Sequence, residues 1–340
     1  MLQQHISLLP YNTFGLPAQA RWFATIDSFA TLRAALSDAR VQGLPRLILG
    51  GGSNLVLTGD FGGLVLHMAS RGVEIVREAG DAVWVRVQAG EAWHGFVQHT
   101  LQQGWFGLEN LSLIPGTVGA APIQNIGAYG VELETVFDSL EALDLATNQV
   151  VTFNHADCQF GYRDSIFKRE GAGRYVILSV TFKLSRVAQA QTHYRDVAQE
   201  LAAMGIDEAT PNDVSRAVIA IRQRKLPDPA VVGNAGSFFK NPIVSKATLD
   251  KLLQAFPGAP HYPQTQASDG SAKLASAWLI DQCGWKGKRF GAAGVHPNQA
   301  LVLINTGGAT GAEVLVLAAR IAEDVERRFG VVLEREPVVV

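Results

Sequence analysis

Glycine is concentrated in two short segments, and this clustering restricts the fold more than any other feature of the sequence. The chain has 34 glycines among 340 residues, without a Gly-X-Y period or a low-complexity run. The first segment, Gly50-Gly51-Gly52-Ser53-Asn54, directly follows the residues RLIL at 46–49, which are typical of a short buried strand. Successive glycines allow a tight turn whose N–H groups point into one concavity, which suits a phosphate or pyrophosphate. The alternative is a plain glycine turn between two strands.

The spacing of this first segment excludes two common nucleotide-binding loops. It is not G-x-G-x-x-G, and residues 55–57 continue as a strand, so a Rossmann dinucleotide fold is disfavoured. It also lacks the Gly-Lys-Ser/Thr ending of a Walker A loop.

The second segment spans residues 114–130 and reads IPGTVGAAPIQNIGAYG. Its small residues let the backbone approach a flat, bulky group, and Thr117, Gln124 and Asn125 offer uncharged hydrogen-bonding groups. The pair of segments predicts two jaws around one large cofactor. For either segment alone, a buried glycine-rich helix and turn is the alternative.

Composition and charge exclude several classes of protein. Hydrophobic residues make up 47% and charged residues 18%, so the chain is folded rather than disordered. A formal net charge of −2 argues against a nucleic-acid or membrane-surface binder. The two cysteines, Cys158 and Cys283, are expected to be reduced thiols. With no leader pattern and no long apolar stretch, we expect a cytoplasmic protein without membrane insertion.

Capping residues and hydrophobic periodicity predict the secondary structure. Ser28 caps one helix, and Thr310 with Glu313 forms a capping box at the start of the longest one. Further helices are predicted at 91–103, from Thr210 towards Arg224, at 245–256 and at 271–283. Strands are predicted at 46–50, 63–68, 73–77, 83–89, 140–146, 150–153, 175–184 and 331–340.

Changes in composition near 68–72 and 222–234 indicate three lobes. The first is α/β, the second is a larger α+β lobe with an antiparallel sheet, and the third is a C-terminal α/β lobe. Whether the final strand returns to the first lobe is open at this point.

Over nearly its whole length, the chain resembles the UDP-N-acetylenolpyruvoylglucosamine reductases, flavoenzymes of peptidoglycan precursor synthesis. Besides the glycine segments, the resemblance rests on NTFG (12–15), GYRDSIFK (161–168), RKLPDP (224–229), GNAGSFFKNP (233–242), HPNQALVLIN (296–305) and LEREP (333–337). It implies an α+β protein with a vanillyl-alcohol-oxidase (PCMH)-type two-lobe FAD-binding fold and a C-terminal α/β substrate-binding domain. The implied boundaries are 1–68 for the first lobe, with or without 331–340, then 69–222 for the second lobe and 223–330 for the substrate domain. The stretch around Tyr194 is typical of the longer form of the family, and we expect a monomer.

The resemblance also implies a reaction, in which a flavin reduces an enolpyruvyl ether. NADPH reduces non-covalently bound FAD, which delivers a hydride from N5 to the terminal methylene carbon of an enolpyruvyl nucleotide sugar. The electron pair left behind forms an enolate conjugated with the substrate carboxylate. That charge requires a fixed cation or hydrogen-bond donor, and then a proton donor for the adjacent carbon.

Three residues match the catalytic positions of the family. Arg163 matches the catalytic arginine of the family. A guanidinium suits this role because it stays charged and binds a carboxylate through two hydrogen bonds. Its alternative role is a surface ion pair with Asp164. Ser237 matches the proton donor, with a serine bonded to backbone at a strand edge as the alternative.

Glu336 matches the glutamate that acts with the arginine. A strand at 331–340 would place Glu334 and Glu336 on one face, and two solvated carboxylates are the alternative. Here the sequence departs from the family, since Pro337 stands where valine is usual. Proline cannot donate to a strand ladder and keeps Glu336 extended.

The resemblance also assigns binding residues. Those assigned to FAD are Gly50, Gly51, Gly52, Ser53, Asn54, Gly116, Thr117, Gly119, Ala120, Gln124, Asn125 and Gly127. Those assigned to the nucleotide sugar are Tyr194, Lys225, Asn241 and Gln299, with Tyr129 and Tyr162 near the flavin or the substrate. No metal site is predicted, because the eight histidines form no HxH or HExxH pattern and His94 and His99 are poorly spaced for one helix face.

Two other functions remain compatible with the residues. The same FAD cradle could serve an oxidase or dehydrogenase of small alcohols or sugars, against which the GNAGSFFKNP and LEREP motifs argue. The third lobe could instead bind a nucleotide sugar without turnover, as a regulator.

Overall fold

The computed structural model describes residues 1–264 and 269–340, which divide into two compact units. The first unit comprises Met1–Ile6, Ala20–Gly52 and Phe61–Arg224. The second comprises Ser7–Gln19, Ser53–Asp60 and Lys225–Val340. The three domain boundaries proposed from the sequence stay a prediction.

The first unit begins with a four-stranded sheet of order β1-β2-β5-β3. Its strands are β1 (Gln3–Ser7), β2 (Gln19–Ile26), β5 (Phe61–Met68) and β3 (Arg46–Leu49). β2 and β3 both pair in parallel with β5. Helix α1 (Phe29–Ser37) lies between β2 and β3 in the chain and is capped by Ser28, whose hydroxyl accepts the Thr31 N–H, as predicted. Since β3 ends at Leu49, the first glycine segment begins directly at the end of this strand.

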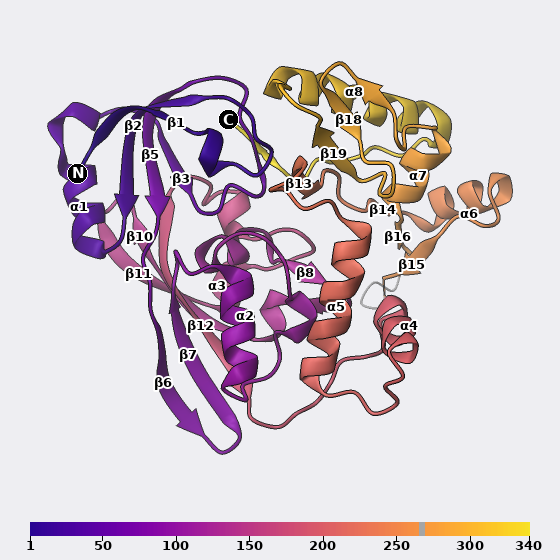
Figure 1. Cartoon of the computed structure of the whole chain (residues 1–340), viewed down its shortest axis with the longest axis horizontal. Coiled ribbons are helices and arrows are strands. Elements are labelled where there is room, and N and C mark those ends of the chain that lie inside the picture. The colour runs from indigo at the N-terminus through magenta and orange to yellow at the C-terminus, as the bar shows by residue number, and fades with distance from the viewer. Residues whose placement is uncertain (265–268) are drawn as a thin grey trace. The chain divides into compact units, whose positions relative to one another are not determined.

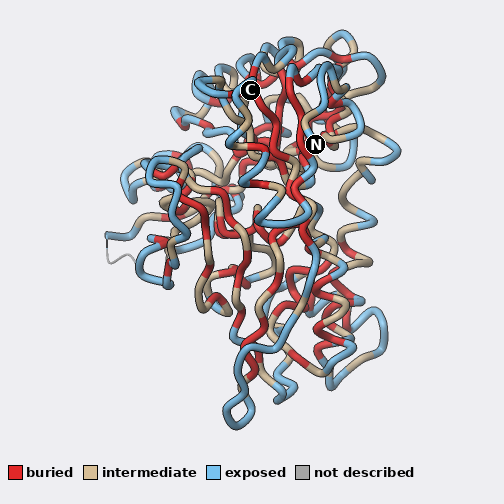
Figure 2. Tube along the Cα trace, turned by 90° about the vertical axis from the view of Figure 1, so that its left-hand side faces the viewer, coloured by how far each residue is buried: buried red, intermediate tan, exposed pale blue. Residues whose placement is uncertain are grey.

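A five-stranded antiparallel sheet of order β11-β10-β12-β7-β6 forms the larger part of the first unit. The strands are β6 (Val73–Ala79), β7 (Ala82–Gln88), β10 (Phe137–Asp144), β11 (Gln149–Asn154) and β12 (Tyr175–Ser185). The central strand β12 alternates apolar residues into the core, as in Phe182, which packs against Phe96 and Trp93 of helix α2 (Trp93–Gln102). Figure 2 shows buried residues along the strands and an exposed tip on the β6–β7 hairpin.

The connections of the first unit are short helices and turns. Residues 118–124 form a 3-10 helix that contains Pro122, followed by the two-residue strands β8 (Gly127–Ala128) and β9 (Val131–Glu132). The helices α3 (His155–Cys158), α4 (Arg195–Ala203) and α5 (Pro211–Lys225) complete the unit. α4 and α5 share a small core of Val197, Leu201, Val214, Ala217, Val218 and Ile221.

The second unit is built on an antiparallel sheet of order β13-β19-β18-β17. These strands are β13 (Gly233–Ser237), β19 (Val302–Asn305), β18 (Ala293–Val295) and β17 (Arg289–Phe290). A smaller sheet joins β14 (Ile243–Val244), β16 (Ala272–Leu274) and β15 (His261–Pro263). The helices are α6 (Lys246–Ala255), α7 (Ser276–Gln282) and α8 (Gly311–Phe329), and Thr310 with Glu313 forms the predicted capping box of α8.

Two sequence predictions about this unit are wrong in part. The helix predicted at 271–283 begins only at Ser276, because Ala272–Leu274 is the central strand of the small sheet and pairs on both sides. The strand predicted at 331–340 is reduced to β20 (Val338–Val339), which pairs in parallel with β4 (Leu55–Val56) of the same unit.

Before β20, Arg335 forms an isolated antiparallel bridge with Phe239, and Pro337 lacks the N–H that would continue the ladder. Glu334 is exposed and pairs with Lys240, whereas Glu336 is only 9% exposed.

Candidate active site

In the first unit, the two glycine segments touch each other directly. A Cβ atom added to Gly50 would lie 2.4 Å from Thr117 Oγ1, and one added to Gly51 would lie 2.8 Å from Gly116 Cα. A Cβ on Gly119 would lie 2.5 Å from Ala89 Cβ. Packing within the protein itself therefore requires glycine at these positions, in addition to the contact with a cofactor predicted from the sequence.

The same place exposes a group of backbone donors. Within the described residues, the N–H groups of Gly50, Gly51, Gly116 and Thr117 donate to no acceptor. None of the four residues is buried. A cluster of backbone N–H groups in a glycine turn matches the oxygens of a phosphate or pyrophosphate. The residues present therefore fit the diphosphate of FAD.

The Asn125 side chain is fully buried and makes its hydrogen bonds within the protein rather than being open to a ligand. Its Nδ2 donates to Glu132 Oε2 at 3.0 Å, Glu134 Oε1 at 3.1 Å and the Gly161 carbonyl at 3.2 Å. Its Oδ1 accepts the Glu134 N–H at 3.0 Å. Asn125 adopts a left-handed backbone with φ 45°, which asparagine tolerates better than most residues. The side chain predicted to bind FAD thus holds the Gly161 turn within the protein.

Arg163 lies at the tip of that turn. Gly161 and Asp164 exchange two backbone hydrogen bonds of 3.1 Å, and Arg163 itself has φ 55°. The Arg163 Nη2 donates to the Gly127 carbonyl at 2.6 Å, and its guanidinium lies 5.2 Å from the centre of the Tyr162 ring. A Cβ on Gly127 would lie 3.1 Å from Arg163 Nη1, so a glycine at 127 leaves room for the guanidinium.

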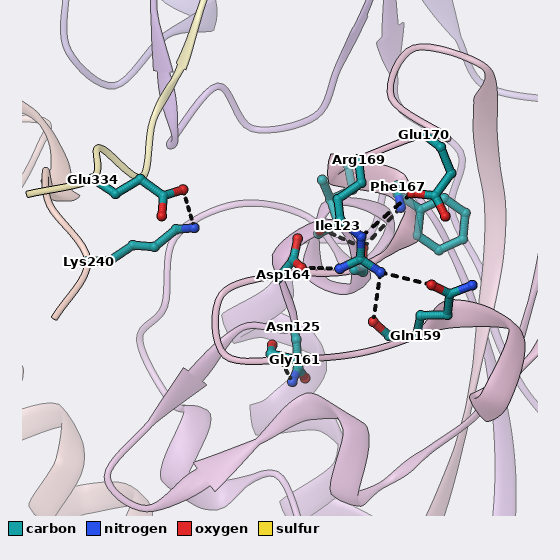
Figure 3. A network of polar contacts seen from close by, with 11 residues as sticks. Ile123, Asn125, Gln159, Gly161, Asp164, Phe167, Arg169, Glu170, Lys240 and Glu334 are labelled. Carbon is teal, nitrogen blue, oxygen red and sulfur yellow. Dashed lines mark hydrogen bonds and ion pairs between the residues drawn. The ribbon is translucent and has the colours of Figure 1, made fainter. Parts of the chain in front are cut away.

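The alternative ion pair between Arg163 and Asp164 does not form. The Asp164 carboxylate pairs with Arg169, which also donates to Gln159 (Figure 3). This network fixes the base of the turn and leaves the Arg163 guanidinium to other partners. Nearby, Lys168 Nζ donates to Gln124 Oε1 at 3.3 Å.

A second arginine near Arg163 escaped the sequence interpretation. Arg222, on α5, is half-buried and has no carboxylate partner among the described residues. Burial lowers the pKa of its guanidinium, a hydrogen bond to Tyr129 acts in the opposite direction, and Arg163 lowers the pKa further. Burial raises the pKa of the Tyr129 hydroxyl, and the Tyr129 ring packs edge-on against Tyr194 at 5.5 Å. Two guanidinium groups and a tyrosine hydroxyl together favour an anion.

In the second unit, a bulge shapes the surroundings of Ser237. The pairing of β13 with β19 shifts register between Asn234 and Ser237, where Gly236 has φ 71° and donates to Asn234 Oδ1 at 2.9 Å. A side chain at 236 would strain this left-handed backbone. Ser237 is half-buried, and its hydroxyl has no hydrogen-bond partner among the described residues.

Glu336 is anchored beside Ser237 within the same unit. The Glu336 N–H donates to the Phe238 carbonyl at 2.9 Å, and the Lys240 N–H donates to the Glu334 carbonyl at 2.8 Å. Asn54 Nδ2 donates to the Glu336 carbonyl at 3.4 Å. Thus the LEREP segment lies against the GNAGSFFKNP strand, and Glu336 is hydrogen-bonded to the residue that follows Ser237.

The remaining substrate candidates are distributed over the second unit. Asn241 Oδ1 accepts the N–H of Ser276 at 3.0 Å, which caps the first turn of α7 and leaves the amide N–H₂ to donate elsewhere. Gln299 Oε1 accepts the Leu301 N–H at 3.4 Å. Lys225 is half-buried in the same unit. Ser53 and Asn54 also belong to this unit, whereas Gly50–Gly52 belong to the first.

A cavity of about 630 Å³ opens in the first unit, away from the predicted residues. Glu109, Gly130 and Lys183 are part of its lining, and no predicted site residue is. Burial raises the pKa of Glu109, although its carboxylate accepts the Gly107 N–H at 2.7 Å. We assign neither cofactor nor substrate to this cavity.

Comparisons with known proteins agree with the two halves of this picture. The family described as "FAD binding domain" matches residues 20–154, and "UDP-N-acetylenolpyruvoylglucosamine reductase, C-terminal domain" matches residues 228–340. The UDP-N-acetylenolpyruvoylglucosamine reductase of Pseudomonas aeruginosa is 58% identical over 336 residues, covering 99% of this chain and 98% of that protein.

The chain belongs to the UDP-N-acetylenolpyruvoylglucosamine reductase family. It is thus a member of a family of oxidoreductases, as the sequence predicted.

Solved structures agree on the fold. The reductase MurB from Thermus caldophilus aligns with a TM-score of 0.68 at 23% identity, covering 100% of this chain and 99% of that one. p-Cresol methylhydroxylase aligns with a TM-score of 0.51 at 10% identity, covering 98% and 85%. The predicted family and fold class, with an FAD-binding part and a C-terminal family domain, are confirmed.

The described residues contain neither a helix suited to a membrane nor a cluster of metal-ligating side chains. In residues 1–264 and 269–340, no helix is long and apolar enough to cross a membrane. The same ranges contain no group of three or more His, Cys, Asp or Glu side chains placed to hold a metal ion.

Proposed function

We propose that the protein reduces UDP-N-acetylenolpyruvoylglucosamine to UDP-N-acetylmuramate, with NADPH as reductant, for peptidoglycan precursor synthesis. The proposal includes non-covalently bound FAD and a monomeric enzyme that acts in the cytoplasm. Family membership supports the reaction. The observation that supports the residue assignment most is the hydrogen bond from Glu336 to Phe238, because it ties the two family motifs together beside Ser237.

Bound FAD would take up a hydride from NADPH and supply it to the methylene carbon of the enolpyruvyl group. The unpaired N–H groups of Gly50, Gly51, Gly116 and Thr117 would hold its diphosphate. Gly52, Ser53, Asn54, Gly119, Ala120, Gln124 and Gly127 would shape the rest of the cradle, and Asn125 would act from behind it through the Gly161 turn.

Hydride addition leaves an electron pair on the carbon next to the substrate carboxylate, and the chain must stabilise that charge. Arg163 would bind the carboxylate with its fixed guanidinium, which the Gly127 carbonyl orients. Because the donor is already in place before the charge develops, it stabilises the transition state without a reorganisation cost. Glu336 would act together with this arginine.

Ser237 would then donate its hydroxyl proton to that carbon, which breaks the O–H bond and forms the C–H bond. A serine is a weak acid, but a carbanion-like enolate is a strong base, and solvent returns the proton to the alkoxide. The Ser237 hydroxyl is half-buried and has no hydrogen-bond partner in the described part of the chain, so no bond to a described residue must break before it donates its proton.

Polar side chains would hold the nucleotide sugar. Lys225 supplies a point charge for the diphosphate, and Asn241 and Gln299 supply amide donors. Tyr194, Tyr129 and Tyr162 would pack against the sugar or the flavin.

Substrate-dependent oxidation of NADPH tests the proposal. The purified, FAD-loaded protein is expected to consume NADPH with UDP-N-acetylenolpyruvoylglucosamine, and not with UDP-N-acetylglucosamine, which lacks the enolpyruvyl group. Binding of the nucleotide sugar without NADPH consumption would instead indicate a regulator. Oxygen-consuming turnover of small alcohols would indicate an oxidase on the same cradle.

A further inference from the structure

A polar connection links helices α2 and α5 through one strained residue of the first unit. His94, in the first turn of α2, accepts the N–H of Leu113 on its Nδ1 at 2.9 Å. The carbonyl of the same Leu113 accepts Arg222 Nε of α5 at 3.1 Å. Both backbone polar groups of Leu113 are therefore held by side chains, one from each helix.

Leu113 has a strained backbone conformation. Its φ is 57°, in the left-handed region that is unfavourable for a non-glycine residue. Without the two side chains, the peptide would relax and its carbonyl would turn away from Arg222. Strain maintained by specific partners is frequent where a group must point in a set direction.

A second set of contacts makes the two helices a rigid frame. Gln98, one turn after His94 on α2, donates to Ser215 Oγ of α5 at 3.1 Å. Ser215 in turn contacts Ser112 Oγ at 2.8 Å, next to Leu113. Figure 1 shows α2 and α5 side by side. Since this frame is independent of His94, loss of His94 would release the Leu113 peptide without separating the helices.

The protonation of His94 suits this arrangement. An Nδ1 that accepts an N–H must be unprotonated, so the neutral ring carries its proton on Nε2. Burial, and secondly the charge of Arg222, lower the pKa of His94 and favour the neutral ring. His99 of the same helix is also half-buried, but its ring packs edge-on against Trp105 and lies outside this connection.

We propose that His94 is a positioning residue: through the Leu113 peptide it directs the Arg222 guanidinium towards an anionic group of the cofactor or the substrate. This inference rests on the proposed function. Arg222 has the chemistry for the role, as a half-buried cation beside Tyr129 and Arg163 with no carboxylate partner among the described residues. Because Nε is fixed by Leu113, the outer face of the guanidinium keeps one orientation for two-point binding of oxygens.

Four variants test the proposal. His94→Leu removes the acceptor and keeps much of the volume, whereas His94→Asn keeps an acceptor near the position of Nδ1. Arg222→Lys keeps the charge and loses the Nε–H donor. His99→Leu is the matched control on the same helix. Urea unfolding of each variant separates a general loss of stability from a loss of positioning.

The expected result for His94→Leu is a ligand affinity about tenfold weaker, the effect of one ordinary hydrogen bond, with His94→Asn close to wild type. A weaker FAD dissociation constant or a shifted flavin reduction potential identifies the cofactor as the anion. A raised KM for the nucleotide sugar with unchanged FAD binding identifies the substrate. The double variant His94→Leu with Arg222→Lys is expected to be no worse than Arg222→Lys alone, because both act through one connection.

Equal ligand binding in His94→Leu and His99→Leu, or additive effects in the double variant, would overturn the proposal. If the wild-type protein did not turn over the nucleotide sugar, the proposed function would fail separately. The FAD dissociation constant, the reduction potential and the ¹⁵N resonances of His94, which are expected to report an unprotonated Nδ1, would still test the positioning role.

Discussion

Asn125 offers a sharp test of how the Gly161–Asp164 turn that carries Arg163 is held. The variant Asn125→Ala removes four side-chain hydrogen bonds, two of them to carboxylates, and leaves a left-handed backbone without the residue type that tolerates it. Hydrogen bonds to charged groups contribute roughly 1.5–3 kcal/mol and neutral ones roughly 0.5–1.5 kcal/mol. Glu132 and Glu134 are half-buried, so water replaces part of what is lost. We expect Asn125→Ala to lower the free energy of unfolding by about 3 kcal/mol.

Asn148 supplies a matched control for the backbone contribution. It too is an asparagine in the left-handed region, with φ 57°, but its side chain is exposed in the turn between β10 and β11. Asn148→Ala should therefore lose only the backbone preference, about 1 kcal/mol. The difference of about 2 kcal/mol isolates the side-chain hydrogen bonds of Asn125.

The assay is urea unfolding of both variants, with the FAD dissociation constant and kcat measured alongside. Because Asn125 holds the Gly161 carbonyl at the base of the Arg163 turn, kcat should fall while FAD affinity changes little. Equal destabilisation of the two variants would refute the reasoning. A large loss of FAD affinity at unchanged stability would instead favour the direct cofactor contact predicted from the sequence.

Two further predictions concern the second unit and helix α5. Asn241→Asp keeps the oxygen that accepts the Ser276 N–H but loses the amide donors, so the KM for the nucleotide sugar should rise while stability is retained. Asn241→Ala should lower both the affinity for the nucleotide sugar and the stability of the protein. Steady-state kinetics and thermal melts distinguish the two variants. Hydrogen bonds from Thr210, and after them a hydrogen bond from Arg216, lower the pKa of Asp213 to about 2 from its ordinary 3.8. A carboxyl whose pKa is lower in the folded state stabilises the protein at pH values above its unfolded-state pKa, and this contribution is lost as the pH falls through its folded-state pKa. In urea titrations, Asp213→Asn should therefore be less stable than wild type at neutral pH and equal to it near about pH 2. A stability difference that persists in acid would contradict this assignment.

Local signals in the sequence predicted most elements of the fold. The Ser28 cap, the Thr310–Glu313 capping box and the alternating strands of the antiparallel sheet depend on residues close in sequence, and the structure contains each of them. Elements determined by distant partners were not predictable in this way. Ala272–Leu274 is helical by composition but becomes a strand because β14 and β15 flank it.

The end of the chain illustrates the same limit. The run VVLEREPVVV has strand-forming valines at both ends, yet only Val338–Val339 pairs as a strand. The reason is partly local, since Pro337 lacks an N–H, and partly distant, since Glu336 and Lys240 make their backbone bonds with the opposite motif.

Motifs identified the candidate site better than they identified individual roles. Arg163, Ser237 and Glu336 stand in the family motifs, but no local signal showed that Asn125 is a buried hub or that Asp164 pairs with Arg169. Arg222 lies in the basic run RQRK, where periodicity alone does not separate a half-buried guanidinium from an exposed one. Leu113 gave no signal at all, because its left-handed backbone is imposed by His94 and Arg222 from two helices.

The central claim is that the chain's own residues act after flavin reduction, on the substrate. Stopped-flow measurement of the two half-reactions in Ser237→Ala tests it most directly, with wild type as reference. We expect NADPH to reduce the flavin bound to this variant at nearly the wild-type rate, and re-oxidation by UDP-N-acetylenolpyruvoylglucosamine to become very slow. Re-oxidation at the wild-type rate would contradict the assignment of Ser237 as the proton donor.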